Sequence, residues 1–316
     1  MSENASKSSR LWSWDTALTG VVPPMISPLT SSRDADEVAV ALLVEHIRAG
    51  GCTGLFILGG CGEGAWLTSR QRGAVTRAAV RVAAGRVPVL VGVLLPATGA
   101  AIEAARQAEA EGADALVVGS PYYYAAESAV QRRHVEAVVQ AVDLPVLLYN
   151  IPQATHNVLS PATVESLARD AGVMGIKDSA GDFEAFHEFL ALKRYRPGFR
   201  VLQGNEHLAA ASLLQGGDGL VPGLGNVAPS LLVALRQAAV AGDAAACARL
   251  QSEIADLGML HTHGHWLPAL KAACAVIGIG NGLPTVPFSP ITKEQRQAIA
   301  AILERHGLLG ASNRST

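Results

Sequence analysis

The chain has 316 residues, of which 49% are hydrophobic and 16% charged, and its formal net charge is −2 at pH 7. This charge gives no basic field for nucleic acid, and the apolar runs are too short and too often broken by Gly or Pro to span a bilayer. We therefore expect a cytoplasmic protein with a large buried core and no nucleic-acid or membrane partner.

The first residues, MSENASKSSR, are polar and lack the apolar segment of a secretory signal. We predict a flexible N-terminal tail over residues 1–17. The four cysteines show no C-x-x-C spacing, which favours reduced, buried thiols over a disulfide framework. They are Cys52, Cys61, Cys247 and Cys274.

Short β-branched or Leu-rich runs then alternate with Ala-rich amphipathic stretches such as AAIEAARQAEAEGA. This alternation is typical of a parallel sheet covered by helices. It predicts eight strands, which are Gly20–Ser27, Gly54–Gly59, Pro88–Leu94, Ala115–Ser120, Pro145–Asn150, Val173–Ser179, Arg200–Asn205 and Gly219–Leu224.

Eight strand–helix units within residues 18–241 match an α/β fold of the closed (β/α)8 or TIM-barrel type. The Ala-rich segments that follow predict a C-terminal helical extension over residues 242–316. An open doubly wound sheet is the alternative fold. It is disfavoured because no G-x-G-x-x-G follows the first strand.

In such a barrel the C-terminal ends of the strands face the active site. Lys177 stands near the end of the run VMGIKDS and is one of only five lysines. A lysine inside a barrel loses hydration, and a neutral amine can form a Schiff base with a ketone. The alternative is a structural pair with Asp178. Tyr149, one strand earlier and at the same depth, favours chemistry because a phenol can transfer protons.

Four motifs follow the strands in order: G-x-x-G-E at 59–63, P-Y-Y at 121–123, Y-N-x-P at 149–152 and G-x-K at 175–177. With them the chain resembles the dihydrodipicolinate synthase and N-acetylneuraminate lyase family, from about Gly20 to Gly310. The resemblance implies a homotetramer, a dimer of dimers, that binds pyruvate or another 2-oxo acid as a Schiff base. It implies neither a cofactor nor a metal.

The same resemblance implies roles for individual residues. Lys177 is the imine-forming residue, Tyr149 transfers protons, and Tyr123 reaches into the neighbouring subunit's site. The backbone carbonyl of Val221 approaches the lysine. The loop that holds the keto-acid carboxylate through its backbone N–H groups contains Gly60, Cys61 and Gly62.

Two departures from the synthase pattern bear on the substrate. Gly60 and Cys61 replace its two hydroxyl residues, and Ala154 replaces the arginine that grips the carboxylate of aspartate semialdehyde. These changes favour an aldolase or lyase for a 2-oxo-3-deoxy sugar acid resembling 2-oxo-3-deoxygluconate or N-acetylneuraminate. The alternatives are synthase-type condensation, dehydration of a sugar acid, and a retired homologue that only binds a keto acid. Dehydration is an alternative because the glycine at position 60 resembles the dehydratase branch of the family.

Polar residues near the seventh strand and beside the two catalytic strands are candidates for binding substrate hydroxyls. They are Asn205, Glu206, Thr155 and Ser179. For each of them a capping role in a loop or helix is an equal alternative.

The motif HTHGH contains His261, His263 and His265. The alternating histidines suggest metal ligands. However, the segment lies beyond the predicted barrel and has no Cys or carboxylate nearby. We therefore favour an exposed loop or a subunit contact.

Overall fold

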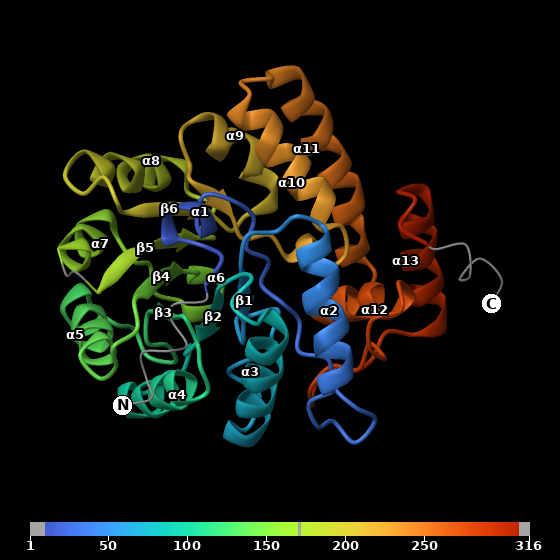
Figure 1. Cartoon of the computed structure of the whole chain (residues 1–316), viewed down its shortest axis with the longest axis horizontal. Coiled ribbons are helices and arrows are strands. Elements are labelled where there is room, and N and C mark those ends of the chain that lie inside the picture. The colour runs from blue at the N-terminus through green and yellow to red at the C-terminus, as the bar shows by residue number, and fades with distance from the viewer. Residues whose placement is uncertain (1–9, 170–171, 310–316) are drawn as a thin grey trace.

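The chain folds around a curled sheet of seven parallel strands that pair in chain order (Figure 1). The computed structural model describes residues 10–169 and 172–309. The strands are β1 (Leu55–Ile57), β2 (Val89–Gly92), β3 (Ala115–Gly119), β4 (Val146–Asn150), β5 (Val173–Asp178), β6 (Arg200–Gln203) and β7 (Gly219–Leu220). Each of them falls within a predicted run, so seven of the eight predicted strands are confirmed.

Helices follow the strands and cover the outside of the sheet, and α10 to α13 gather on one side of it (Figure 1). The α-helices are α1 (Trp14–Ala17), α2 (Glu37–Ala49), α3 (Ser69–Ala83), α4 (Thr98–Ala110), α5 (Ser128–Val139), α6 (Pro152–Thr155), α7 (Pro161–Ala168), α8 (Phe183–Ala191), α9 (Ala209–Leu214), α10 (Pro229–Val240), α11 (Ala244–Gly258), α12 (Trp266–Val276) and α13 (Lys293–Arg305). Short 3-10 helices are η2 (Leu192–Arg194), η3 (Glu206–Leu208), η4 (Gly223–Asn226) and η5 (Met259–Thr262). None of the described helices is long and apolar enough to cross a membrane.

The predicted first strand, Gly20–Ser27, forms only isolated bridges to the two edge strands of the sheet. The N–H of Val22 donates to the carbonyl of Leu220 in β7 at 2.9 Å, and the N–H of Met25 donates to the carbonyl of Phe56 in β1 at 2.8 Å. The segment therefore lies between β7 and β1 without forming a continuous ladder with either.

Prolines account for this difference from the prediction. Pro23 and Pro24 have no N–H to donate, so the segment cannot form consecutive ladder hydrogen bonds. The same cause shortens the predicted eighth strand, because Pro222 follows soon after β7 ends at Leu220.

Alternate strand residues point to opposite faces of the sheet, as pleating requires. On β4, Leu147 and Tyr149 belong to a small cluster on the concave inner face. Val146 and Leu148 belong to the larger cluster that packs under the helices. The inner cluster contains Leu18, Val22, Phe56, Leu90, Ala115, Val117, Leu147, Tyr149, Leu202 and Val221.

The pairing of β4 with β5 contains one irregularity. Val146 pairs with Val173, but the next residue, Leu147, pairs with Gly175, so Met174 has no partner in this ladder. From that point the register is regular, and Tyr149 pairs with Lys177. One extra residue on β5 thus sets the register at the end of the strand.

The predicted N-terminal tail, residues 1–17, is described only from Arg10 onward. Arg10 forms an ion pair with Asp114 at 2.6 Å, the N–H of Leu11 donates to Gly85 O, and helix α1 follows. The predicted boundary between the barrel and the C-terminal extension, residues 241 and 242, falls between α10 and α11.

Candidate active site

Lys177 and Tyr149 lie side by side at the C-terminal ends of adjacent strands. The Nζ atom of Lys177 lies 4.0 Å from the centre of the Tyr149 ring and 5.1 Å from that of Phe56. Both Lys177 and Tyr149 are buried. The amine therefore lies against two aromatic faces, away from bulk water.

The structural alternative for Lys177, an ion pair with Asp178, is wrong. Consecutive residues of a strand point to opposite faces, and Asp178 Oδ1 accepts a hydrogen bond from Asn150 Nδ2 at 2.7 Å on the other side of the sheet. Burial raises the pKa of Asp178 to about 6. Within the described chain no carboxylate forms an ion pair with Lys177, so its amine is available for chemistry.

Gly204, just after β6, leaves the space that the lysine side chain occupies. A Cβ at this position would lie 2.6 Å from Lys177 Cε and 2.1 Å from Ser179 Oγ. Both distances are shorter than non-bonded carbon contacts allow. The absence of a side chain at Gly204 is therefore a steric requirement for the observed position of Lys177.

Two cavities lie at this end of the strands and share the wall residues Tyr149, Ile151, Ala154 and Trp266. Lys177 itself lines neither cavity and lies behind the ring of Tyr149. The first, here named the aromatic chamber, has a volume of ≈ 360 Å³. Its walls include Trp66, Leu94, Tyr122, His265, Trp266 and Phe288. The ring of Phe288 contacts those of Trp66 and His265, with centroid distances of 5.2 and 4.7 Å.

The second cavity, here named the polar chamber, has a volume of ≈ 410 Å³. Its walls carry hydrogen-bonding side chains, including Gln153, Ser179, Asn205, Glu206, His207 and His261. The two chambers thus offer chemically different surroundings on either side of Tyr149.

The structure brings most of the predicted site residues to these chambers. Gly60 and Thr155 line the aromatic chamber, and Cys61, Ser179, Asn205 and Glu206 line the polar chamber. Gly62 and Val221 do not line either chamber. A Cβ on Gly62 would lie 2.7 Å from Leu58 N, so this glycine permits a close backbone approach, while Val221 packs in the inner cluster.

Tyr123 is not brought to the site by its own chain. Its side chain is 83% exposed, and its backbone adopts the left-handed conformation with φ of 82°. Its ring contacts only the equally exposed Tyr124 among the described aromatic rings, edge to face at 5.0 Å. Tyr122, which the sequence prediction did not select, is the tyrosine of this group that lines the chamber, and its hydroxyl donates to Leu94 O at 3.3 Å.

The loop of residues 59–63 turns back on itself, since the N–H of Glu63 donates to Gly60 O at 3.1 Å. The N–H groups of Cys61 and Gly62 donate to no backbone carbonyl among the described residues, and the N–H of Cys61 interacts with its own thiol. Free amides of this kind can bind a carboxylate without any hydroxyl side chain. Burial raises the pKa of Cys61 to about 12, so its thiol is neutral and forms part of the wall rather than acting as a nucleophile.

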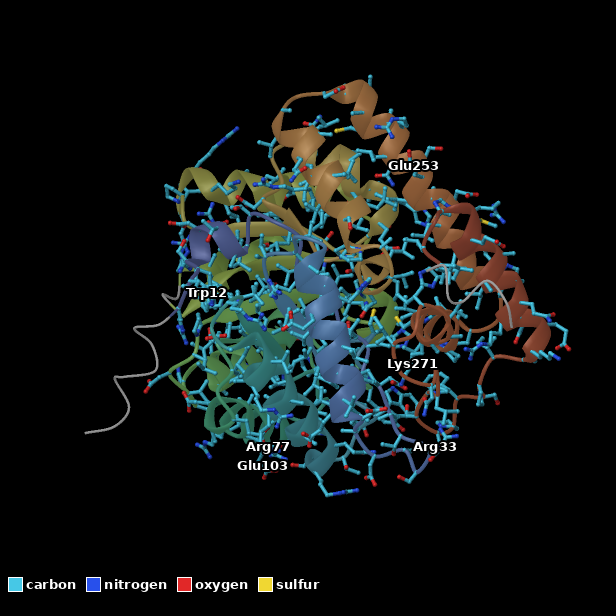
Figure 2. The ribbon with its side chains drawn as sticks, turned by 45° about the vertical axis from the view of Figure 1, so that its right-hand side comes forward. Trp12, Arg33, Arg77, Glu103, Glu253 and Lys271 are labelled. Atoms are coloured by element: carbon cyan, nitrogen blue, oxygen red, sulfur yellow. The ribbon has the colours of Figure 1, made fainter. Side chains whose placement is uncertain are left out.

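Glu63 at the end of this loop is fully buried and connects it to the C-terminal helices. Its Oε2 accepts a hydrogen bond from Lys271 Nζ, and its Oε1 accepts from Thr285 N at 2.7 Å and Thr285 Oγ1 at 2.9 Å. Lys271 belongs to α12 and is labelled in Figure 2. Lys271 also donates to Ser27 O at 2.9 Å. The buried carboxylate and ammonium are thus both paired and hydrogen-bonded, as low-dielectric surroundings require.

Glu206 and Asn205 begin helix η3 at the wall of the polar chamber. Asn205 Oδ1 accepts from His207 N at 3.1 Å, so the capping alternative is observed for this residue. Glu206 Oε1 accepts from Leu224 N at 2.6 Å. Burial raises the pKa of Glu206 to about 7, against the opposing effects of the Leu224 N–H and the Lys177 charge.

The C-terminal wall of both chambers was missed by the sequence prediction. Residues 263–265 of HTHGH form the exposed turn before α12, as expected, and the subunit contact stays a prediction. His261 lines the polar chamber, and His265 lines the aromatic chamber and caps α12. Among the described residues no cluster of three His, Cys, Asp or Glu side chains is arranged to hold a metal ion.

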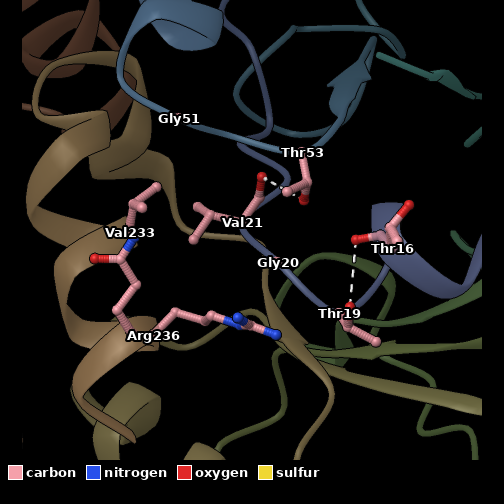
Figure 3. Close-up of a pocket in the computed structure, with 9 residues that line it drawn as sticks. Thr16, Thr19, Gly20, Val21, Gly51, Thr53, Val233 and Arg236 are labelled. Carbon is pink, nitrogen blue, oxygen red and sulfur yellow. Dashed lines mark hydrogen bonds between the residues drawn. The ribbon is translucent and has the colours of Figure 1, made fainter. Parts of the chain in front are cut away.

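A third cavity, ≈ 300 Å³, lies at the opposite end of the strands, beside Gly20, Thr53 and Arg236 (Figure 3). It contains none of the predicted site residues. The hydroxyl of Thr53 donates to Ala17 O at 2.8 Å, so this group already has a partner within the scaffold. We therefore place the active site at the C-terminal ends of the strands.

A buried amine without a carboxylate partner thus lies beside a tyrosine at the C-terminal ends of the strands, the end at which enzymes built on parallel α/β sheets carry their active sites. The sequence model of the dihydrodipicolinate synthetase family matches residues 17–306. The chain belongs to this family.

Similarity to individual relatives extends over nearly the whole chain. A probable 2-dehydro-3-deoxy-D-pentonate aldolase of Escherichia coli, YjhH, is 31% identical, covering 92% of this chain and 98% of the relative. A 4-hydroxy-tetrahydrodipicolinate synthase of Salinibacter ruber is 32% identical, covering 88% and 91%. The crystal structure of E. coli YagE in complex with pyruvate superposes with a TM-score of 0.87 at 31% identity, covering 92% and 98%.

Substitution of Lys271 by Met tests the buried pair. The change leaves the Glu63 carboxylate without its counter-ion, which typically costs about 3–5 kcal/mol. We expect a loss of that size in the free energy of unfolding measured by urea denaturation. The double variant Lys271→Met/Glu63→Gln is expected to lose less, because no uncompensated charge remains buried.

The matched control is Arg249→Met on α11, which removes the exposed pair between Arg249 and Glu253. Exposed pairs contribute about 0–1 kcal/mol. If Lys271→Met were no more destabilising than this control, the pair would not hold the loop to α12.

Proposed function

We propose that the protein is a pyruvate-dependent aldolase, a carbon–carbon lyase that cleaves or forms a 2-oxo-3-deoxy sugar acid through an imine on Lys177. The observation that carries this proposal is the position of the Lys177 amine, buried without a carboxylate partner and 4.0 Å from the Tyr149 ring centre. Family membership, relatives named as 2-dehydro-3-deoxy sugar-acid aldolases and the pyruvate bound in YagE support it.

In the cleavage direction the neutral amine of Lys177 adds to the C2 carbonyl, and loss of water gives the iminium. The C4 hydroxyl gives its proton to Tyr149, C4 becomes an aldehyde, and the electrons of the C3–C4 bond move into the iminium to form an enamine. Protonation at C3 and hydrolysis then release pyruvate and restore the amine. The free amides of Cys61 and Gly62 are suited to the carboxylate at C1.

The walls of the chambers favour a hydroxylated tail over a second carboxylate. No arginine lines either chamber among the described residues, and the position of the synthase arginine is occupied by Ala154. A methyl group cannot form the bidentate pair by which a guanidinium holds a carboxylate. The side chains of Gln153, Asn205 and Glu206, in contrast, suit hydrogen bonds to hydroxyl groups.

We also propose that the fold is a closed eight-stranded barrel and that it assembles as a homotetramer. The hydrogen bonds of residues 20–25 to both edge strands support closure. The exposed, left-handed Tyr123 is suited to reach the site of a neighbouring subunit, which is the role that the resemblance to the family implies.

Dehydration is the second candidate reaction, and Gly60 is the observation that favours it. A Cβ at Gly60 would meet no atom within 4 Å, so the place of the synthase hydroxyl is open space at the edge of the aromatic chamber. In a dehydratase the same imine expels a substrate hydroxyl as water and the C3–C4 bond is kept.

Reduction with borohydride in the presence of pyruvate tests the imine. We expect a mass increase on the peptide that contains Lys177, because reduction converts the imine to a stable secondary amine. Lys177→Arg keeps the charge but has no neutral amine, so it is expected to fold and to give no adduct and no turnover. An adduct confined to another lysine would refute the central role of Lys177.

The substrate class is tested by parallel assays with three substrates. These are aspartate semialdehyde plus pyruvate, 2-oxo-3-deoxygluconate and N-acetylneuraminate. We expect sugar-acid cleavage to exceed the condensation by about tenfold or more, since a lost charge-assisted contact costs at least about 1.4 kcal/mol. Pyruvate release identifies aldol cleavage, and a dioxo acid without pyruvate identifies dehydration. Efficient condensation without sugar-acid turnover would overturn the assignment.

The pH dependence of cleavage tests Glu206. With a pKa of about 7, this carboxyl loses its proton as the pH rises from 6 to 8, and the carboxylate accepts hydrogen bonds from hydroxyls better than the acid does. We expect kcat/KM to rise over this interval in the wild type, and this rise to be absent in Glu206→Gln. An unchanged profile in the variant would assign the rise to another group.

A further inference from the structure

His261 is the residue of HTHGH that enters the polar chamber. It belongs to η5, and it lines the chamber together with Glu206 and His207 of η3. The same three side chains also line a smaller adjoining cavity of ≈ 230 Å³, bordered by Met259. His261 thus stands on the outer side of the polar chamber, on the C-terminal wall rather than on a strand.

The hydrogen-bonding state of the His261 ring follows from its contacts. Its Nδ1 lies 3.4 Å from the backbone carbonyl oxygen of Trp266, which can only accept, so Nδ1 carries the proton. Burial lowers the pKa of His261, and the neighbouring His207 acts in the same direction. The ring is therefore neutral at pH 7, and Nε2 has a free lone pair.

The other polar groups that line the polar chamber include both donors and acceptors, among them the amide nitrogen of Asn205 and the ring of His207. Glu206 presents carboxylate oxygens, and the side-chain oxygen of Asn205 is occupied by His207 N. No lysine or arginine lines this chamber among the described residues. A chamber with a carboxyl group and no cationic side chain suits a neutral hydroxylated ligand, and it disfavours a carboxylate or phosphate.

We propose that His261 selects the tail of the substrate by accepting, through Nε2, a hydrogen bond from a hydroxyl at the end remote from the 2-oxo group. The preferred substrate is then a 2-oxo-3-deoxy acid with a neutral hydroxylated tail, not one that ends in a second carboxylate or a phosphate. This inference rests on the proposed function, because it names the substrate class of the same site.

Kinetics of His261→Phe test the assignment, since phenylalanine keeps an aromatic ring but has no acceptor. The substrates are 2-oxo-3-deoxygluconate and its analogues deoxygenated at C5 or at C6. We expect His261→Phe to lower kcat/KM for the parent about five- to tenfold, mainly through KM, as the loss of one neutral hydrogen bond does. For one of the analogues the variant and the wild type are expected to have equal kcat/KM, because that analogue lacks the donor.

His263 supplies a matched control in the same motif, because it is not among the residues that line the two chambers. His263→Phe is expected to leave kcat/KM for the parent unchanged. If His261→Phe fails to fold, His261→Leu is to be compared with His263→Leu, since leucine also has no acceptor and the preference between parent and analogues is read in the same way. Wild-type enzyme is further expected to use a 2-oxo-3-deoxy acid with a terminal carboxylate more slowly than the parent.

Several outcomes would overturn the inference. Equal losses in His261→Phe for the parent and both analogues would show a structural role, and no loss would show that His261 does not contact substrate. A higher wild-type kcat/KM for the substrate with a terminal carboxylate than for the parent would show that the proposed substrate class is wrong. If borohydride traps pyruvate on Lys177 of the wild type, any of these outcomes refutes only the proposed role of His261. If the wild type gives no adduct, the proposed function is refuted, and this inference is refuted with it.

Discussion

The buried pair between Glu63 and Lys271 is the interaction through which the strand-end loop and the C-terminal helices become one structure. A charge buried alone in an apolar interior is destabilising. If the loop moved away from α12, Glu63 and Lys271 would either become exposed to water or stay buried without a counter-ion. Thr285 adds two further hydrogen bonds to the same carboxylate. The free amides of the loop and the wall formed by α12 are therefore held at a fixed separation, and that separation defines both chambers.

Under the proposed function, different parts of the chain supply reactivity and selectivity. The amine and the phenol come from β5 and β4, whose ladder fixes them side by side at the inner face. The walls proposed to surround the substrate tail come from η3, η5 and α12, which follow the strands of the sheet or lie beyond them in the sequence. This separation gives a physical reason why one family holds both synthases and sugar-acid aldolases, because the wall can differ while the strand pair stays in place.

Local sequence patterns were sufficient for seven of the eight predicted strands and for the adjacent positions of Lys177 and Tyr149. Buried parallel strands read as continuous apolar runs, and a lysine or tyrosine near the end of such a run stands out. The C-terminal wall could not be found in this way. His261 and Trp266 lie on short or helical segments whose relation to β4 and β5 is set by tertiary packing. The partner of Glu63 was equally hidden, since Lys271 is 208 residues away and resembles any lysine of an amphipathic helix. The sequence of HTHGH drew attention to its three histidines, but it did not indicate that the segment packs beside the C-terminal ends of the strands.

The unpaired Met174 in β5 determines to which face of the sheet the Lys177 side chain points. Val173 belongs to the cluster under the helices, and strict alternation from there would also turn Lys177 towards the helices and Asp178 towards the inner face. The extra residue reverses the phase once, just before Gly175, and so exchanges the two faces for the rest of the strand. Deletion of Met174 would therefore restore strict alternation and turn Lys177 towards the helices. Deletion of the residue between Gly175 and Lys177 would likewise put the Asp178 carboxylate where the amine belongs. Between Gly175 and Lys177 the number of residues is therefore more tightly constrained than the type of residue at most positions.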